Sequence, residues 1–320
     1  MKYLEFINKK IKENVAMHEK LVLFGQNINA GSCLGGLTRG LKVKNDSLII
    51  NSTNSENSLC GFGFGLMMSN ISSIFFMKQL DFLLLGIDHL VNTFNIIRNN
   101  QQMISNASFT IMPIIVDSGF QGPQSSHNNL GDFCSIARIK GYTITNKFDA
   151  EKIIDSKLLS PGFRIIGVSQ RLFKNEIIEP ENVVFVNDEF SLFQYTDGKD
   201  VTIVCFNFSF PQGWDIMYKL KEKGIESSLF NVNSPVSINW EKIIENVGKT
   251  KKIIVIDDSK SVNVNCDALL AEICGNINLI KKIVFKKKLD KNWLNPIDDQ
   301  MELDFDLIIS EIMDESIKQK

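Results

Sequence analysis

The sequence predicts an α/β protein of two doubly wound domains, in which helices pack on mostly parallel sheets. Short apolar runs of strand length alternate along the chain with segments of helix length, which is the pattern of such folds. The chain has 320 residues, 44% of them hydrophobic, and this length suits two domains of roughly 100 to 200 residues. The alternation loosens between Pro180 and Asp200, so we place the junction near residue 190 and expect domains at 1–190 and 191–320.

The first half supplies its elements in regular order. Helices are expected at 3–19, 56–68, 81–98 and 150–158, and strands at 21–25, 73–78, 109–117, 141–146 and 164–169. The strand segments are apolar without a break, as in a parallel sheet that is covered on both faces. A polar, glycine-rich loop, SGFQGPQSSHNNLGD, follows the strand at 109–117. Loops at the carboxyl ends of parallel strands tend to carry functional sites.

The second half repeats this alternation after hairpin-like strands within 180–200. Strands are expected at 201–207, 227–232, 252–257 and 280–285, and helices at 213–223, 240–247 and 266–274. No repeat with a period of about 20 to 50 residues is visible, which excludes solenoids and propellers.

Composition and charge exclude several classes of protein. The formal charge of -2 is spread evenly, so we expect no nucleic-acid partner. Lys78, Asp81 and Asp88 interrupt the apolar segments well short of the ~20 residues that a membrane span needs. The first twenty residues lack the pattern of a signal peptide, and we expect a cytoplasmic protein. Six widely spaced cysteines without a C-x-x-C pair indicate reduced thiols.

General motifs for chemistry are few. The segment Gly61-Phe62-Gly63-Phe64-Gly65 has glycines at alternate positions but not in the order of a phosphate-binding loop. Close packing against another backbone or a cofactor is the favoured reason for these glycines. The histidines at 18, 89 and 127 have no metal-ligand spacing and no accompanying nucleophile motif, so neither a metal site nor a catalytic triad is predicted.

An ordered set of motifs runs through nearly the whole chain. These are GQNINAGSCLGGLTRGL at 25–41, NSTNSENSLCGFGFGLMM at 51–68, IFFMKQLDFLLLGIDHLVN at 74–92, GPQSSHNNLGDF at 122–133, DGKDVTIV at 197–204 and GKTKKIIVIDD at 248–258. Together they resemble the beta subunits of the thiamine-diphosphate-dependent 2-oxo acid dehydrogenases, from about residue 1 to 315. The resemblance implies a pyrimidine-binding thiamine-fold domain at 1–190 and a transketolase C-terminal-like domain at 191–320.

The resemblance assigns the site residues. Glu56 takes the place of the glutamate that hydrogen-bonds the aminopyrimidine ring of thiamine diphosphate, and Phe82 the place of the aromatic residue that stacks on it. Ser55 and His89 are the other implied cofactor-binding positions, and the alternative for His89 is a structural role in its helix. A carboxyl against the ring nitrogen favours the imino tautomer that removes the proton from the thiazolium carbon, so Glu56 is implied to be catalytic. The alternative is that Glu56 only stabilises the first turn of its helix, where acidic residues are common, and both roles are compatible.

Three departures from the family pattern bear on function. The histidine of the family's Q-H-S-Q loop falls on Ser125, and His127, two residues later, is the candidate to replace it as a catalytic group. Gln26 stands where the family has an acidic residue. The segment that binds a structural potassium ion in the family reads SKLLSPG at 156–162 and lacks the acidic and amide ligands, so binding of a monovalent cation is left open.

The resemblance also implies partners. The family holds the diphosphate and Mg²⁺ on an alpha subunit with a G-D-G...N-N motif, which this sequence lacks, so the chain is expected to act only with an alpha-like subunit in an α₂β₂ assembly. Self-association of the beta-like chains and a lipoyl-carrying acyltransferase are further implied partners. The leading hypothesis is a subunit that decarboxylates a pyruvate-like 2-oxo acid. The alternatives are a non-oxidative, transketolase-like carboligase subunit and a catalytically silent structural subunit.

Overall fold

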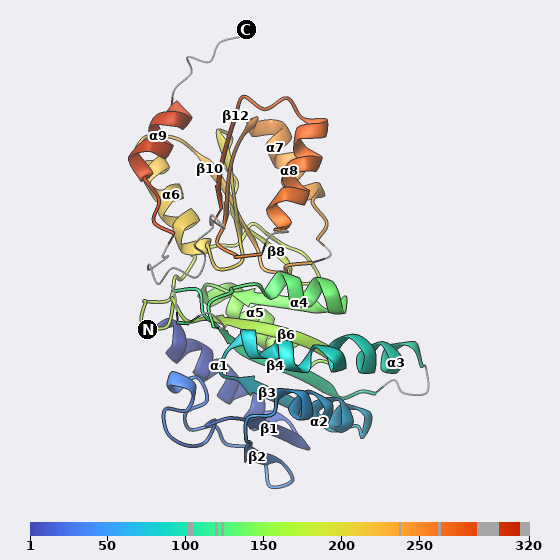
Figure 1. The fold of residues 1–320 in the computed structure, drawn as a ribbon. Helices are drawn as coiled ribbons and strands as arrows, with labels where there is room; N and C mark the ends of the chain where they lie inside the picture. The colour runs from blue at the N-terminus through green and yellow to red at the C-terminus, as the bar shows by residue number, and fades with distance from the viewer. Residues whose placement is uncertain are drawn as a thin grey trace.

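The computed structural model describes residues 1–100, 105–118, 121–122, 125–236, 238–261, 264–286 and 301–313. Within these ranges the strands form two six-stranded sheets, one from each half of the chain. The two halves are stacked, with the second above the first in Figure 1. The prediction of an α/β fold with two doubly wound units is therefore confirmed.

The first sheet is entirely parallel, with strand order β2-β1-β3-β4-β6-β5. Its strands are β1 (Leu21–Gly25), β2 (Leu48–Asn51), β3 (Ser72–Met77), β4 (Ser108–Ile115), β5 (Lys140–Ile144) and β6 (Gly162–Ser169). Its helical segments are α1 (Tyr3–Met17), the short 3-10 turn η1 (Leu34–Gly36), α2 (Glu56–Met68), η2 (Leu80–Gly86), η3 (His89–Thr93), α3 (Phe94–Asn99), α4 (Leu130–Ala137) and α5 (Lys147–Lys157).

Both faces of this sheet are buried, which explains the unbroken apolar runs. Successive side chains of a strand point to opposite faces. On one face, Leu21 and Leu23 of β1 belong to the core that includes residues of α1 and α5. On the other face, Val22 and Phe24 belong to a separate core that includes residues of α2, α3 and α4. The period of two thus divides one apolar strand between two hydrophobic cores.

The second sheet has the order β12-β11-β9-β10-β8-β7, with β8 and β7 antiparallel at one edge. Its strands are β7 (Phe185–Val186), β8 (Leu192–Thr196), β9 (Val201–Phe206), β10 (Ser227–Val232), β11 (Lys252–Asp257) and β12 (Lys281–Lys286). The helices are α6 (Phe210–Glu222), α7 (Glu241–Thr250), α8 (Asn265–Asn276) and α9 (Phe305–Met313). Because β7 pairs with β8, the second sheet begins a few residues before position 190; the boundary near 190 stays a prediction.

One predicted helix is not continuous in the structure. The continuous helix expected at 81–98 is divided into the 3-10 helix η2, the π-helical turn η3 and the short helix α3. Gly86 lies at the division, where an added Cβ would come within 2.5 Å of the sulfur of Cys60 in α2. The segment therefore bends around α2. Among the described residues no single helix could span a membrane by length and apolarity; the pair 80–86 and 89–99 passes that test only jointly and is bent by 69°.

Candidate active site

The candidate site lies at the carboxyl edge of the first sheet. Helix α2 begins five residues after β2, η2 begins three residues after β3, and the loop with His127 follows β4. Because β2, β1, β3 and β4 are parallel neighbours in the sheet, their carboxyl ends share one edge. The sheet thus brings together segments that are separated by more than 70 residues in the sequence.

Glu56 is the first residue of α2 and is 9% exposed. Within the described part of the chain its carboxyl group forms no hydrogen bond or ion pair, although buried carboxyl groups usually have partners. Cys60 lies one turn later in the helix. Burial and the neighbouring Glu56 carboxylate raise the pKa of its thiol to about 12. Ser55 precedes the helix and donates a hydrogen bond to the Ser58 hydroxyl at 2.9 Å. Glu56 is therefore a nearly buried carboxyl group that is available to a ligand.

The glycines of α2 allow its neighbours to approach closely. An added Cβ at Gly61 would lie 2.9 Å from Nε2 of His89, and one at Gly63 would lie 2.2 Å from the ring of Phe109. The preferred interpretation of the Gly61–Gly65 segment, close packing, agrees with these contacts. His89 is partly buried in the π-helical turn η3, and its Nδ1 lies 2.9 Å from the Thr93 hydroxyl. Its ring lies over Gly61 and forms part of the helix packing.

Phe82 follows the end of β3 and is partly buried. Within the described residues it takes part in no ring–ring contact and belongs to neither hydrophobic core cluster of this half. Helix α2 and η2 contact each other, and the backbone of Glu56 lies close to Gly86 of η2. The sheet edge therefore carries a carboxyl group and an aromatic ring on two elements that touch.

Asp81 lies in the same motif as Phe82 but had no predicted role in the site. It is 4% exposed, and its Oδ1 accepts a hydrogen bond from the backbone N–H of His127 at 3.1 Å. Its Oδ2 is buried without a partner among the described residues. Burial raises the pKa of Asp81, whereas the charges of His127 and Lys260 lower it. Its position beside Phe82 in the motif was the available signal, but only the fold shows that it holds the His127 loop.

The His127 loop is also attached to the second half. Asn128 donates a hydrogen bond to the backbone oxygen of Asp258 at 2.6 Å and accepts one from Asn207 at 2.9 Å. Ser125, the residue in the place of the family histidine, is buried at 5% exposure. The structure thus places His127, partly buried, directly next to the anchoring residue Asn128.

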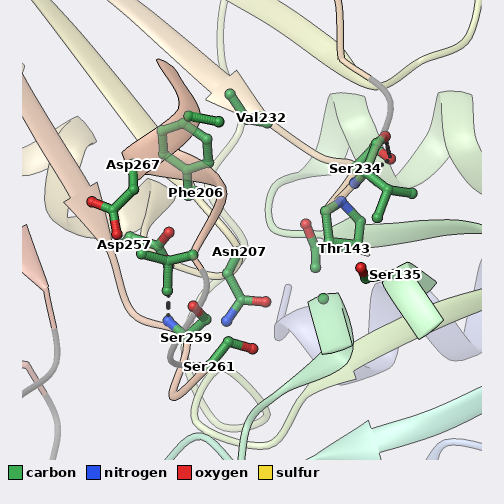
Figure 2. A pocket seen from close by; sticks show the side chains of 15 residues that line it. Ser135, Thr143, Phe206, Asn207, Val232, Ser234, Asp257, Ser259, Ser261 and Asp267 are labelled. Carbon is green, nitrogen blue, oxygen red and sulfur yellow. Dashed lines mark hydrogen bonds between the residues drawn. The ribbon is translucent and has the colours of Figure 1, made fainter. Parts of the chain in front are cut away.

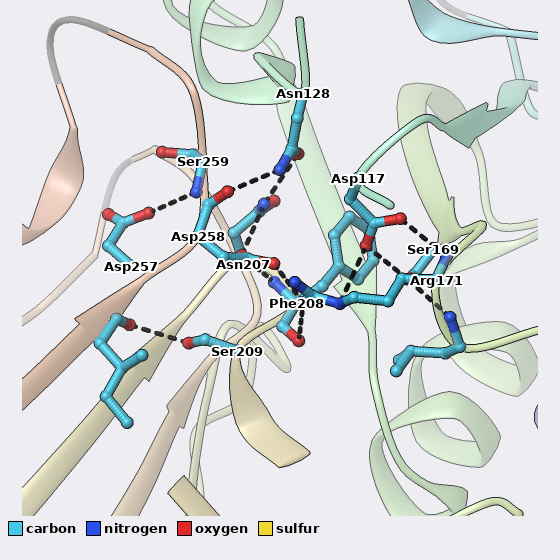
Figure 3. A network of polar contacts seen from close by, with 12 residues as sticks. Asp117, Asn128, Ser169, Arg171, Asn207, Phe208, Ser209, Asp257, Asp258 and Ser259 are labelled. Carbon is cyan, nitrogen blue, oxygen red and sulfur yellow. Dashed lines mark hydrogen bonds and ion pairs between the residues drawn. The ribbon is translucent and has the colours of Figure 1, made fainter. Parts of the chain in front are cut away.

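A buried polar network joins the carboxyl edges of the two sheets (Figure 3). Arg171, just after β6, forms an ion pair with Asp258 after β11, and its backbone N–H donates to Asp117 after β4 at 2.9 Å. The side chains of Asp117 and Asp258 are fully buried. Burial raises the pKa of Asp117, and the Arg171 guanidinium lowers it. No single motif indicated this network, because its members come from four strand ends.

Glu56, Phe82, His89 and Asp81 thus lie on elements that contact one another. The backbone N–H of His127 is hydrogen-bonded to the Asp81 carboxyl group. Among the described residues, no group of three or more His, Cys, Asp and Glu side chains has the arrangement of a metal site.

Comparison with known proteins gives relatives over most of the chain. It is 20% identical over 300 residues to the mitochondrial pyruvate dehydrogenase E1 component subunit beta of Drosophila melanogaster, covering 85% of this chain and 74% of that protein. It is also 20% identical over 286 residues to the 2-oxoisovalerate dehydrogenase subunit beta of Bacillus subtilis, covering 86% and 85%. No family model matches the chain.

A solved structure has the same fold. The inactive beta4 tetramer of a split-gene transketolase aligns with a TM-score of 0.66 at 15% sequence identity, covering 88% of this chain and 87% of that chain. This likeness concerns the arrangement of the two α/β units.

Proposed function

This chain is a relative of the beta subunits of the thiamine-diphosphate-dependent 2-oxo acid dehydrogenases, and we propose that it is the beta-type subunit of such an enzyme. With an alpha-like partner it decarboxylates a pyruvate-like 2-oxo acid and transfers the acyl or aldehyde unit. The observation that carries the proposal is Glu56, a nearly buried carboxyl group without a hydrogen-bond partner in the described chain, at the carboxyl edge of the sheet.

The residues at this edge fit the aminopyrimidine ring of thiamine diphosphate. A ring nitrogen would give the Glu56 carboxyl the hydrogen-bond partner that it lacks, which offsets the cost of burying it. Phe82 offers a partly buried ring that stacks on no other described ring, as a stacking platform requires. When bound, the cofactor supplies the carbon nucleophile for the 2-oxo carbonyl. Glu56 holds a proton at the ring nitrogen, and His89 and Ser55 lie on the surrounding elements.

His127 is the proposed acid–base group for the substrate. A hydrogen bond to Asp81 attaches its loop to the end of β3, and a hydrogen bond from Asn128 attaches the loop to the second half. Both attachments restrict the position of the imidazole relative to Phe82. A histidine is suited to proton transfer near neutral pH.

We assign the diphosphate and Mg²⁺ to the alpha-like partner, because the sequence has no G-D-G...N-N motif. The cofactor would then lie between the two chains, and neither chain alone would be active. We further propose an α₂β₂ assembly with contacts between the beta-type chains, and a lipoyl-carrying acyltransferase as the acceptor.

The test is carbon dioxide release from pyruvate and related 2-oxo acids by this chain co-expressed with its alpha-like subunit. Glu56→Gln keeps the shape of the side chain but removes the carboxyl group that holds the proton at the ring nitrogen. We therefore expect activity to fall by about a hundredfold or more. Glu222→Gln is the matched control, since Glu222 is exposed at the end of α6. An active pair that tolerates Glu56→Gln would contradict the role of Glu56, and a stable pair inactive on every 2-oxo acid would favour a structural subunit.

A further inference from the structure

A cavity lies between the two halves, and neither Glu56 nor Phe82 is among its lining residues. Its volume is about 320 Å³, within the range of small-molecule sites. Its walls come from the ends of β9, β10 and β11, from the start of α8 and from α4 of the first half (Figure 2). None of these residues is assigned to the proposed reaction or to the cofactor, although Asn207 also hydrogen-bonds Asn128 of the His127 loop.

The position of this cavity follows the general rule for ligand sites in open α/β sheets. From β9 the chain moves to β10 on one side and then to β11 on the other side of β9. The connections therefore diverge between β9 and β11, and ligands bind outside the carboxyl ends of the strands at such a point. Asn207 follows β9 and Ser259 follows β11, and both line the cavity.

Among the described residues, one buried hydroxyl group of the cavity lacks a hydrogen-bond partner, and one buried carboxyl group lacks an ion pair. Ser261 is 7% exposed, and its hydroxyl forms no hydrogen bond with the described residues. Asp257 is 2% exposed, and its Oδ1 accepts from the Ser259 N–H at 3.0 Å. The side chains of Ser259 and Cys266 also hydrogen-bond its carboxyl group. Lys286 acts on it through its charge, but no described lysine or arginine forms an ion pair with it. A buried carboxylate is normally paired with a cation, and a buried hydroxyl is normally hydrogen-bonded.

The charges and hydroxyl groups around the cavity define a ligand class. Asp257 and Asp267 are its charged lining residues, with no lysine or arginine in the described lining, and Asp267 is already paired with Lys286. Figure 2 shows both aspartates on one side and Ser135 and Thr143 on the other. An anion would meet the buried carboxyl group of Asp257, which forms no ion pair within the described chain, whereas an ammonium group would pair with it.

We propose that this cavity binds a small polyhydroxylated amine, with its ammonium group on Asp257 and a hydroxyl group on Ser261. Asn207 and Thr143 provide further hydrogen-bonding groups for the remaining hydroxyls. The site is separate from the proposed thiamine site and does not depend on that function.

Calorimetric titration of the full chain with glucamine, sorbitol and gluconate tests the ligand class, because these probes share a carbon chain and differ in charge. We expect one glucamine per chain, bound about tenfold more tightly than sorbitol because its hydrogen bond to Asp257 is charge-assisted. Gluconate is expected not to bind. Equal or tighter binding of gluconate, or no binding of glucamine to the folded chain, would overturn the proposal.

Variants locate the site. Asp257→Asn should reduce glucamine to the affinity of sorbitol, and Ser261→Ala should weaken both by about fivefold through loss of one hydrogen bond. Ser135→Trp, at an exposed position of the cavity wall on α4, should block both ligands. Glu272→Trp, exposed on α8 outside the cavity, is the matched control and should keep binding. Glucamine binding that survives both Asp257→Asn and Ser135→Trp in folded protein would show that the ligand binds elsewhere.

Discussion

Arg164 shows how a single buried charge holds the backbone of the segment 156–162. It is 5% exposed on β6, and its guanidinium donates to the backbone oxygens of Lys157, Ser160 and Pro161, in the segment for which cation binding was left open. Burial lowers its pKa to about 10, which still leaves it protonated at neutral pH. The guanidinium therefore supplies a fixed positive charge to these carbonyl groups.

Arg164→Met should lower the free energy of unfolding by about 3 kcal/mol, because it leaves several buried carbonyl oxygens without donors. Arg164→Lys should recover only part of this loss, since an ammonium group lacks the planar fork of donors. Urea unfolding measures both. The unchanged chain should be equally stable in sodium and potassium salts; a stability that rises specifically with potassium would contradict this account of Arg164.

At the scale of elements, helix α2 determines how closely its neighbours pack. Gly63→Ala should destabilise the fold by about 1–3 kcal/mol, because the new Cβ would overlap the Phe109 ring in a filled core. Gly65→Ala, two residues later, meets nothing within 4 Å and should stabilise the helix by up to about 1 kcal/mol. Thermal unfolding of the two variants compares them directly. A Gly63→Ala protein as stable as Gly65→Ala would contradict the packing of α2 on β4.

Most elements were predictable because their apolar period is strong. The bounds of α2, β1, β10 and β11 agree with the predicted segments residue for residue. The strand β2 was missed because its four residues are partly or fully exposed at the sheet edge, which weakens the pattern. Helix α4 was missed because its first residues, Leu130 and Gly131, read as the end of a polar loop. The bend near Gly86 depends on contact with Cys60, which no local pattern reports.

At the scale of the whole molecule, Asp149 of α5 links the two halves. Its fully buried carboxyl group accepts hydrogen bonds from Asn231 at 3.0 Å and Asn233 at 2.8 Å, both at the end of β10 or just after it. Burial nevertheless raises its pKa from 3.8 to about 6, against the effect of hydrogen bonds from Thr145, Asn146 and Asn233. The folded chain therefore binds this proton more tightly than the unfolded chain does.

The sign of the pH dependence follows from that shift. The contribution of Asp149 to the free energy of unfolding is greatest below about pH 4 and falls as the pH rises to about 6, by an amount on the order of 3 kcal/mol. Asp149→Asn cannot titrate, so the stability of the unchanged chain relative to this variant should decrease over that range. Urea unfolding at several pH values measures the difference. A difference that grows with pH would contradict the raised pKa.

The sequence alone named candidate residues of the site, but not the residues that hold them in place. Glu56, Phe82 and His127 were identified by their places in ordered motifs, and the parallel sheet brings the segments that carry them to one edge. The roles of Asp81 and Arg171 depend on contacts across 46 and 87 residues of sequence, with His127 and Asp258, so they required the fold. The ligand-binding roles of the site residues stay predictions.

The central claim is that this chain forms half of a thiamine site. Calorimetric titration with thiamine diphosphate and Mg²⁺ tests it most directly, first on the chain alone and then on the chain co-purified with its alpha-like subunit. We predict tight binding by the pair only, lost in Glu56→Ala and kept in Glu222→Gln. A stable pair that binds no thiamine diphosphate, or that binds it unchanged with Glu56→Ala, would contradict the account.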